Sequence, residues 1–137
     1  MPALDPMKQR SLVITSLLAI VLMTFHVTDD IIRGISPPNP NNANGVFIFL
    51  VWLLGTLAFS ERILGYVIMF LGGLFAAAMP FLHMRGKSYL RIASTSEGFF
   101  FVWDLYAVGT LGVFCMIMAA YALWNAWRRK RVRETAA

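Results

Sequence analysis

Four apolar segments, separated by short polar stretches, fill most of this 137-residue chain. A helix rises about 1.5 Å per residue, so about 20 mainly apolar residues cross the roughly 30 Å hydrocarbon core of a bilayer. We predict membrane spans at residues 11–33, 45–60, 63–84 and 98–124, of which 45–60 is the shortest. The sequence therefore predicts an all-α integral membrane four-helix bundle that forms a single transmembrane domain over residues 1–137.

The composition excludes several other classes of protein. Hydrophobic residues make up 58% of the chain and charged residues 14%, whereas soluble domains average roughly 45–50% and about 25%. A soluble domain of this size could not bury so much apolar surface. Because Cys115 is the single cysteine, internal disulfides and CxxC motifs are also excluded. With no large aqueous domain to carry chemistry, a non-catalytic role is favoured over an enzyme.

The basic residues predict the orientation, since cytoplasmic loops are enriched in Lys and Arg. If both termini are cytoplasmic, that side holds eight of the twelve basic residues: Lys8, Arg10, Arg62, Arg128, Arg129, Lys130, Arg131 and Arg133. The external side then holds Arg33, Arg85, Lys87 and Arg91. We therefore predict an N-in, C-in protein of the bacterial inner (plasma) membrane, with a short hairpin at residues 60–62 joining the second and third spans.

The run of basic residues after the fourth span predicts a cytoplasmic tail at residues 128–137 that lies against anionic lipid headgroups. Its candidate lipid ligands are Arg128, Arg129, Lys130, Arg131 and Arg133. This position beside a membrane span excludes nucleic acid as the expected partner, although the net charge of the chain is +5.

Small and aromatic residues predict how the helices pack and where they meet the membrane surface. Small residues allow close helix approach, and they form stripes at Gly65, Gly72 and Ala76 and at Gly109 and Gly112. Residues 99–101 with Trp103, and Trp124 with Trp127, are typical of outer and inner aromatic belts. Asn44 is an expected N-cap, and Ser94 with Glu97 has the spacing of a capping box.

The few polar residues within the spans gather near the external face. His26, Asp29 and Asp30 lie toward the end of the first span, His83 ends the third, and Asp104 lies near the start of the fourth. His26 and Asp30 share a helix face with Arg33, which is also spaced to pair with Asp29. These side chains predict a His/Asp pocket open to the external side.

Four interpretations of this cluster stay open from the sequence. The side chains can be interfacial groups that pair locally and fix helix register. His26, Asp30, His83 and Asp104 can form a four-coordinate zinc or copper site. His26 and His83 can ligate a b-type haem. Finally, protonatable groups in a membrane often belong to a proton or ion path.

The expected role is that of a small multi-pass, non-catalytic subunit or assembly partner of a membrane complex. Membrane lipid and either further copies of the chain or other membrane subunits are its expected partners, and no cofactor is expected by default. The alternative is a protein that handles a metal, haem b, protons or ions through the His/Asp cluster.

Overall fold

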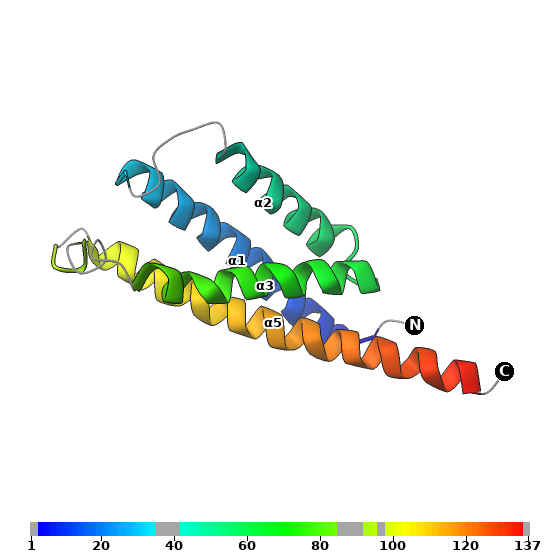
Figure 1. The fold of residues 1–137 in the computed structure, drawn as a ribbon. Helices are drawn as coiled ribbons and strands as arrows, with labels where there is room; N and C mark the ends of the chain where they lie inside the picture. The colour runs from blue at the N-terminus through cyan, green and yellow to red at the C-terminus, as the bar shows by residue number, and fades with distance from the viewer. Residues whose placement is uncertain (1–2, 35–41, 85–91, 96–97, 136–137) are drawn as a thin grey trace.

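The computed structural model describes residues 3–34, 42–84, 92–95 and 98–135. Its principal elements are four α-helices, labelled in Figure 1 as α1 (Pro6–Ile32), α2 (Asn42–Leu57), α3 (Ile63–Met84) and α5 (Gly98–Thr135). The predicted all-helical class is confirmed. Helices α1, α3 and α5 are long and apolar enough to cross a membrane. These lengths and compositions are those of an integral membrane protein, whereas the N-in, C-in orientation stays a prediction.

The first helix begins before the expected range of 11–33 because its start is well capped. The Asp5 carboxylate accepts a hydrogen bond from the Lys8 backbone N–H at 3.0 Å, and this bond lowers the pKa of Asp5. Pro6 occupies the first helical turn, where its missing N–H is tolerated. At the other end, Gly34 takes φ +68°, the left-handed conformation that commonly terminates a helix.

The second helix is the shortest of the four. The expected range was 45–60, whereas α2 spans Asn42–Leu57 and its apolar part, Asn44–Leu57, is shorter than the other three spans. Residues 58–62 form the turn into α3, closed by a hydrogen bond from Arg62 N–H to Phe59 C=O at 2.9 Å. The expected range of the third helix was 63–84, and α3 spans Ile63–Met84.

The last helix is longer than the expected range of 98–124. Its start is capped by the Thr95 hydroxyl, which accepts from the Gly98 N–H at 3.0 Å; the expected capping box of Ser94 with Glu97 stays a prediction, since Glu97 lies outside the described residues. The helix continues to Thr135 because Arg and Lys are good helix formers. The basic residues of the expected tail are therefore helical, and Arg131 stacks 3.6 Å from the Trp127 ring centroid.

Helices α3 and α5 make the most extensive contact in the described bundle, α1 packs across α5, and α2 contacts α1 and α3 but not α5. At the α3–α5 crossing, a Cβ atom on Gly73 would lie 2.7 Å from Met116 N and 2.9 Å from Gly112 O. Gly73, which was not part of the expected stripe, thus allows this approach. Gly72 faces the Trp52 ring on α2, and Gly65 faces the Phe59 carbonyl.

Figure 1 shows both chain termini at one end of the bundle and the C-terminal ends of α1 and α3 at the other, beside the start of α5. One core cluster, around Met23, Trp52 and Leu105, fills the half nearer those ends. A second, around Leu12, Tyr66 and Cys115, fills the half nearer the termini. The polar residues predicted as a site lie beyond the first cluster.

Candidate metal centre

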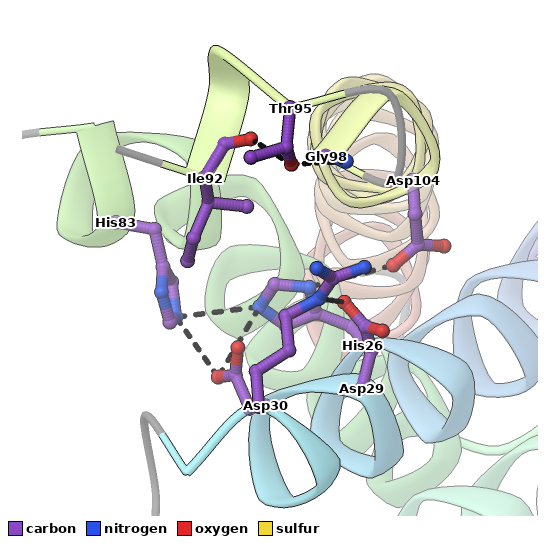
Figure 2. A network of polar contacts seen from close by, with 9 residues as sticks. His26, Asp29, Asp30, His83, Ile92, Thr95, Gly98 and Asp104 are labelled. Atoms are coloured by element: carbon purple, nitrogen blue, oxygen red, sulfur yellow. Dashed lines mark hydrogen bonds and ion pairs between the residues drawn. The ribbon is translucent and has the colours of Figure 1, made fainter. Parts of the chain in front are cut away.

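Four of the five polar side chains in the predicted site converge at the end of the bundle opposite the chain termini (Figures 1 and 2). His26 and Asp30 lie one turn apart on α1, His83 lies in the last turn of α3, and Asp104 lies in the second turn of α5. His26, Asp104 and Asp30 are only 1%, 3% and 7% exposed. Three helices that are distant in sequence therefore enclose one polar cluster.

Three atoms of this cluster form a compact triangle. His26 Nε2 lies 3.3 Å from His83 Nε2 and 3.8 Å from Asp30 Oδ2, and the third side, from His83 Nε2 to Asp30 Oδ2, is 3.5 Å. Zinc bonds of 2.0–2.2 Å at the tetrahedral angle place neighbouring ligand atoms about 3.3–3.6 Å apart. The triangle therefore has the size of one face of a tetrahedral metal site.

The surroundings of His26 Nδ1 determine whether His26 Nε2 has a lone pair to offer a metal ion. His26 Nδ1 faces the Asp104 carboxylate, with 3.4 Å between Nδ1 and Oδ2. A carboxylate in that position favours a proton on Nδ1, and a neutral imidazole protonated there has its lone pair on Nε2. That lone pair then points at His83 and Asp30. Metal-binding histidines are commonly oriented by a carboxylate on their other nitrogen in this way.

Several buried atoms of the cluster make no hydrogen bond in the structure: His26 Nδ1, Asp30 Oδ1 and both carboxylate oxygens of Asp104. An uncompensated buried charge costs several kcal/mol. With neutral imidazoles, the two carboxylates also give the cluster a charge of about −2. A divalent cation held by Asp30 and the two histidines would balance this negative charge.

Asp29 is not brought into this cluster. Its carboxylate binds the Arg33 side chain, with 2.6 Å between Nε and Oδ2, and the pair lies one turn apart along α1. The predicted Asp29–Arg33 spacing thus brings the two together, and α1 directs Asp29 and Asp30 to different partners. Asp29 therefore offers a neighbouring control for the buried aspartates.

The structure also changes the role of two residues. One of the four interpretations made Asp104 a fourth ligand, but it lies across the His26 ring from the triangle, where its carboxylate orients that ring. Phe101 was expected in the lipid-facing belt, but it is 2% exposed and stacks on His26 with ring centroids 5.7 Å apart. Its spacing three residues before Asp104 places both on one face of α5, which is the signal in the sequence that could have identified it.

A haem does not fit between the two histidines. Their rings meet edge to face with centroids 4.7 Å apart, and the Nε2 atoms are 3.3 Å apart. Asp30 also approaches both nitrogens. This leaves no gap for a macrocycle between the imidazoles.

Within the described residues, the polar groups do not form a continuous path through the bundle. Below His26, the buried face of α1 continues with Met23, Ile20 and Ala19 before it reaches Ser16. Ser16 lies about 15 Å along the helix from His26. This apolar section separates the cluster from the polar groups deeper in the bundle, so the geometry favours binding over conduction.

Comparisons with protein-family models, with curated proteins and with solved structures found no match for this chain.

Proposed function

We propose that this integral membrane protein binds a divalent transition-metal ion, with zinc as the best fit, at one end of its helix bundle. The observation that carries the proposal is the triangle of His26 Nε2, His83 Nε2 and Asp30 Oδ2, whose sides of 3.3, 3.5 and 3.8 Å lie within about 0.2 Å of the ligand spacings in a tetrahedral face. Asp104 supports the site by orienting His26. In this assignment, one coordination position is left for water or an exogenous ligand.

The donor set favours zinc over copper(I). Two imidazole nitrogens and one carboxylate oxygen suit Zn²⁺, whereas copper(I) selects thiolate and thioether sulfur. Among the described residues, the triangle contains no sulfur ligand. Met23 and Met79 are instead buried in the adjoining apolar core. We therefore take Zn²⁺ as the probe ion.

The test is zinc binding by the full-length chain in lipid nanodiscs, measured by competition with a chromophoric chelator. We expect one zinc per wild-type chain and an affinity loss of more than about 100-fold in His83→Ala, since removal of an orienting group alone costs 10–100-fold. Asp29→Asn is the matched control, because it removes a neighbouring carboxylate that points away from the triangle. Equal binding by wild type and His83→Ala would refute the proposal.

We further propose the orientation expected from the sequence, with both termini cytoplasmic in a bacterial inner membrane and the metal site external. Both termini lie at one end of the bundle (Figure 1), and the cluster lies at the other, toward the C-terminal ends of α1 and α3. The orientation therefore decides which compartment supplies the ion. A cysteine placed at Glu134 should react with an impermeant thiol reagent only from the cytoplasmic side, and one at Thr95 only from the external side. The opposite labelling pattern would mean that the metal site faces the cytoplasm.

A second proposed role is that of a membrane subunit, as a homo-oligomer or beside other membrane subunits. The observation that favours it is the incomplete enclosure of α2. Apolar side chains along this helix are 53–67% exposed: Val46, Phe47, Leu50, Leu54 and Leu57. Crosslinking through cysteines placed on this face should capture a specific dimer or heteromer in membranes. A monomer under all conditions would remove this role and leave the metal site untouched.

A further inference from the structure

A hollow of about 350 Å³ opens between α1 and α5 beside Asp104, and neither histidine lines it. It is lined by Leu22, Phe25, Phe100, Trp103, Asp104 and Ala107. Apart from the Asp104 carboxylate, these side chains are apolar or aromatic. An acid in the wall of a hydrophobic hollow indicates a ligand with one polar group and an otherwise apolar body.

A second hollow of about 330 Å³ adjoins the first along α5. The two share Trp103 and Ala107, and the second continues past Tyr106 to Thr110 and Leu111. It runs away from the start of α5, toward the middle of the membrane span. Together the two hollows form a strip, here called the α5 groove, with Asp104 toward one end and an apolar floor leading into the bilayer.

Asp104 has hydrogen-bonding capacity that the protein does not use. The residue is 3% exposed and neither carboxylate oxygen has a hydrogen-bond partner. Figure 2 shows one oxygen turned toward His26 and the other turned away from it. His26 Nδ1 lies 3.4 Å from Oδ2, so Oδ1 is the oxygen that faces away from the ring and keeps an acceptor site that the protein does not fill.

We propose that the α5 groove binds a single-ring phenol or hydroquinone that carries an apolar tail. The ring hydroxyl donates a hydrogen bond to Asp104 Oδ1, and the ring packs among Phe25, Phe100 and Trp103. The tail lies along the second hollow toward Leu111. Flat aromatic ligands suit such a lining because offset and edge-to-face ring contacts add to apolar burial.

The two competing kinds of occupant fit the groove less well. A lipid acyl chain would fill the apolar hollows but leave Asp104 unpartnered. An ammonium group could pair with Asp104, but transfer of a full charge to a lipid-facing groove is costly. A neutral phenol satisfies the carboxylate and enters from the bilayer without that cost. The proposal does not rest on a bound metal, because it uses the oxygen that does not face His26.

The experiment measures binding of a decyl-substituted hydroquinone to the full-length chain in nanodiscs, anaerobically, by quenching of Trp103 fluorescence. We expect saturable quenching that Trp103→Phe abolishes. The dimethyl ether of the same compound lacks donors, and we expect it to bind about 10-fold more weakly or worse, the effect of losing one hydrogen bond to a charged acceptor. Equal binding of the two compounds would identify an ordinary lipid groove and overturn the proposal.

Variants separate this site from the metal centre. Ala107→Phe fills the groove without altering a cluster side chain, so hydroquinone binding should fall at least 10-fold while zinc binding stays unchanged. Ala120→Phe, on an exposed part of the same helix, is the matched control and should change neither. Unaltered hydroquinone binding in Ala107→Phe would overturn the proposal. Hydroquinone binding by a chain that fails to bind zinc would sustain the groove site and refute only the metal centre.

Discussion

Two of the polar clusters in the described part of this apolar bundle differ in how completely their hydrogen bonds are satisfied. In the middle, Ser16 on α1 lies 2.8 Å from the Thr56 hydroxyl of α2 and accepts from Trp52 Nε1 at 2.9 Å. Thr56 also donates to the Trp52 carbonyl at 2.9 Å. At the end of the bundle, by contrast, His26, Asp30 and Asp104 retain buried atoms without a hydrogen-bond partner.

This difference distinguishes a structural network from a binding site. Hydroxyl and indole groups that satisfy one another join two helices and need nothing further. Carboxylates and imidazoles that converge without satisfying one another are costly unless another species completes them. The middle network therefore accounts for how α2 is held on α1, and the end cluster is where a ligand is expected. The two regions can be tested against each other by mutation.

The largest effect is expected for His26→Gln. This change removes the Nε2 ligand atom and also the N–H that faces Asp104, so zinc affinity should fall by more than about 100-fold, beyond the loss for an orienting group alone. Competition with a chelator measures the affinity, and circular dichroism shows whether the helices persist. Zinc binding within a few-fold of wild type would remove His26 from the site.

Asp104→Asn should have the next largest effect. The amide keeps the shape of the side chain but removes the charge that holds the proton on His26 Nδ1, so we expect a 10–100-fold loss of zinc affinity. The loss should be smaller than for His26→Gln, since the three ligand atoms remain. A loss as large as that of His26→Gln would instead indicate that Asp104 is itself a ligand.

Most residues of the end cluster could be predicted from the sequence, because helical periodicity decides which residues share a face. His26 and Asp30 recur at i, i+4, and α1 buries both. The depth of His83 and Asp104 followed from their distance to the span ends. The expected range of α3, 63–84, was readable from its uninterrupted apolar run.

The remaining features depend on rotation of one helix against another, which a single sequence does not encode. Depth in the membrane placed Asp104 near His26 but could not say which imidazole nitrogen it would face. The adjacent Gly72 and Gly73 are equally small, and only the packing directs one toward α2 and the other toward α5. Likewise, the sequence does not distinguish Phe101 from its neighbours in the expected aromatic belt. Only the rotation of α5 in the bundle places its ring against His26.

Ser16→Ala should break the middle network without affecting the end cluster. It removes the acceptor of the Trp52 indole, and hydrogen bonds between membrane helices contribute about 0.6 kcal/mol on average and up to about 1.7 kcal/mol. We therefore expect a loss of stability of that order in reversible unfolding, with unchanged zinc affinity. A large change in zinc affinity would show that the two regions are coupled.

Asp29→Asn should have the smallest effect. Asp29 pairs with Arg33 rather than with the histidines, so the change removes a negative charge near the triangle but no ligand. Zinc affinity should stay within about threefold of wild type, a shift of less than about 0.7 kcal/mol. A loss comparable to that of Asp104→Asn would mean that overall negative charge, rather than a defined geometry, attracts the ion.

We propose above all that the two histidines and Asp30 form one tetrahedral metal site. Its most direct test is visible absorption of the wild-type chain in nanodiscs during titration with Co²⁺, an ion that reports the geometry of a zinc site. We predict intense tetrahedral d–d bands that saturate at one ion per chain and disappear when zinc is added. A spectrum identical to that of aqueous octahedral Co²⁺ throughout the titration would contradict the assignment.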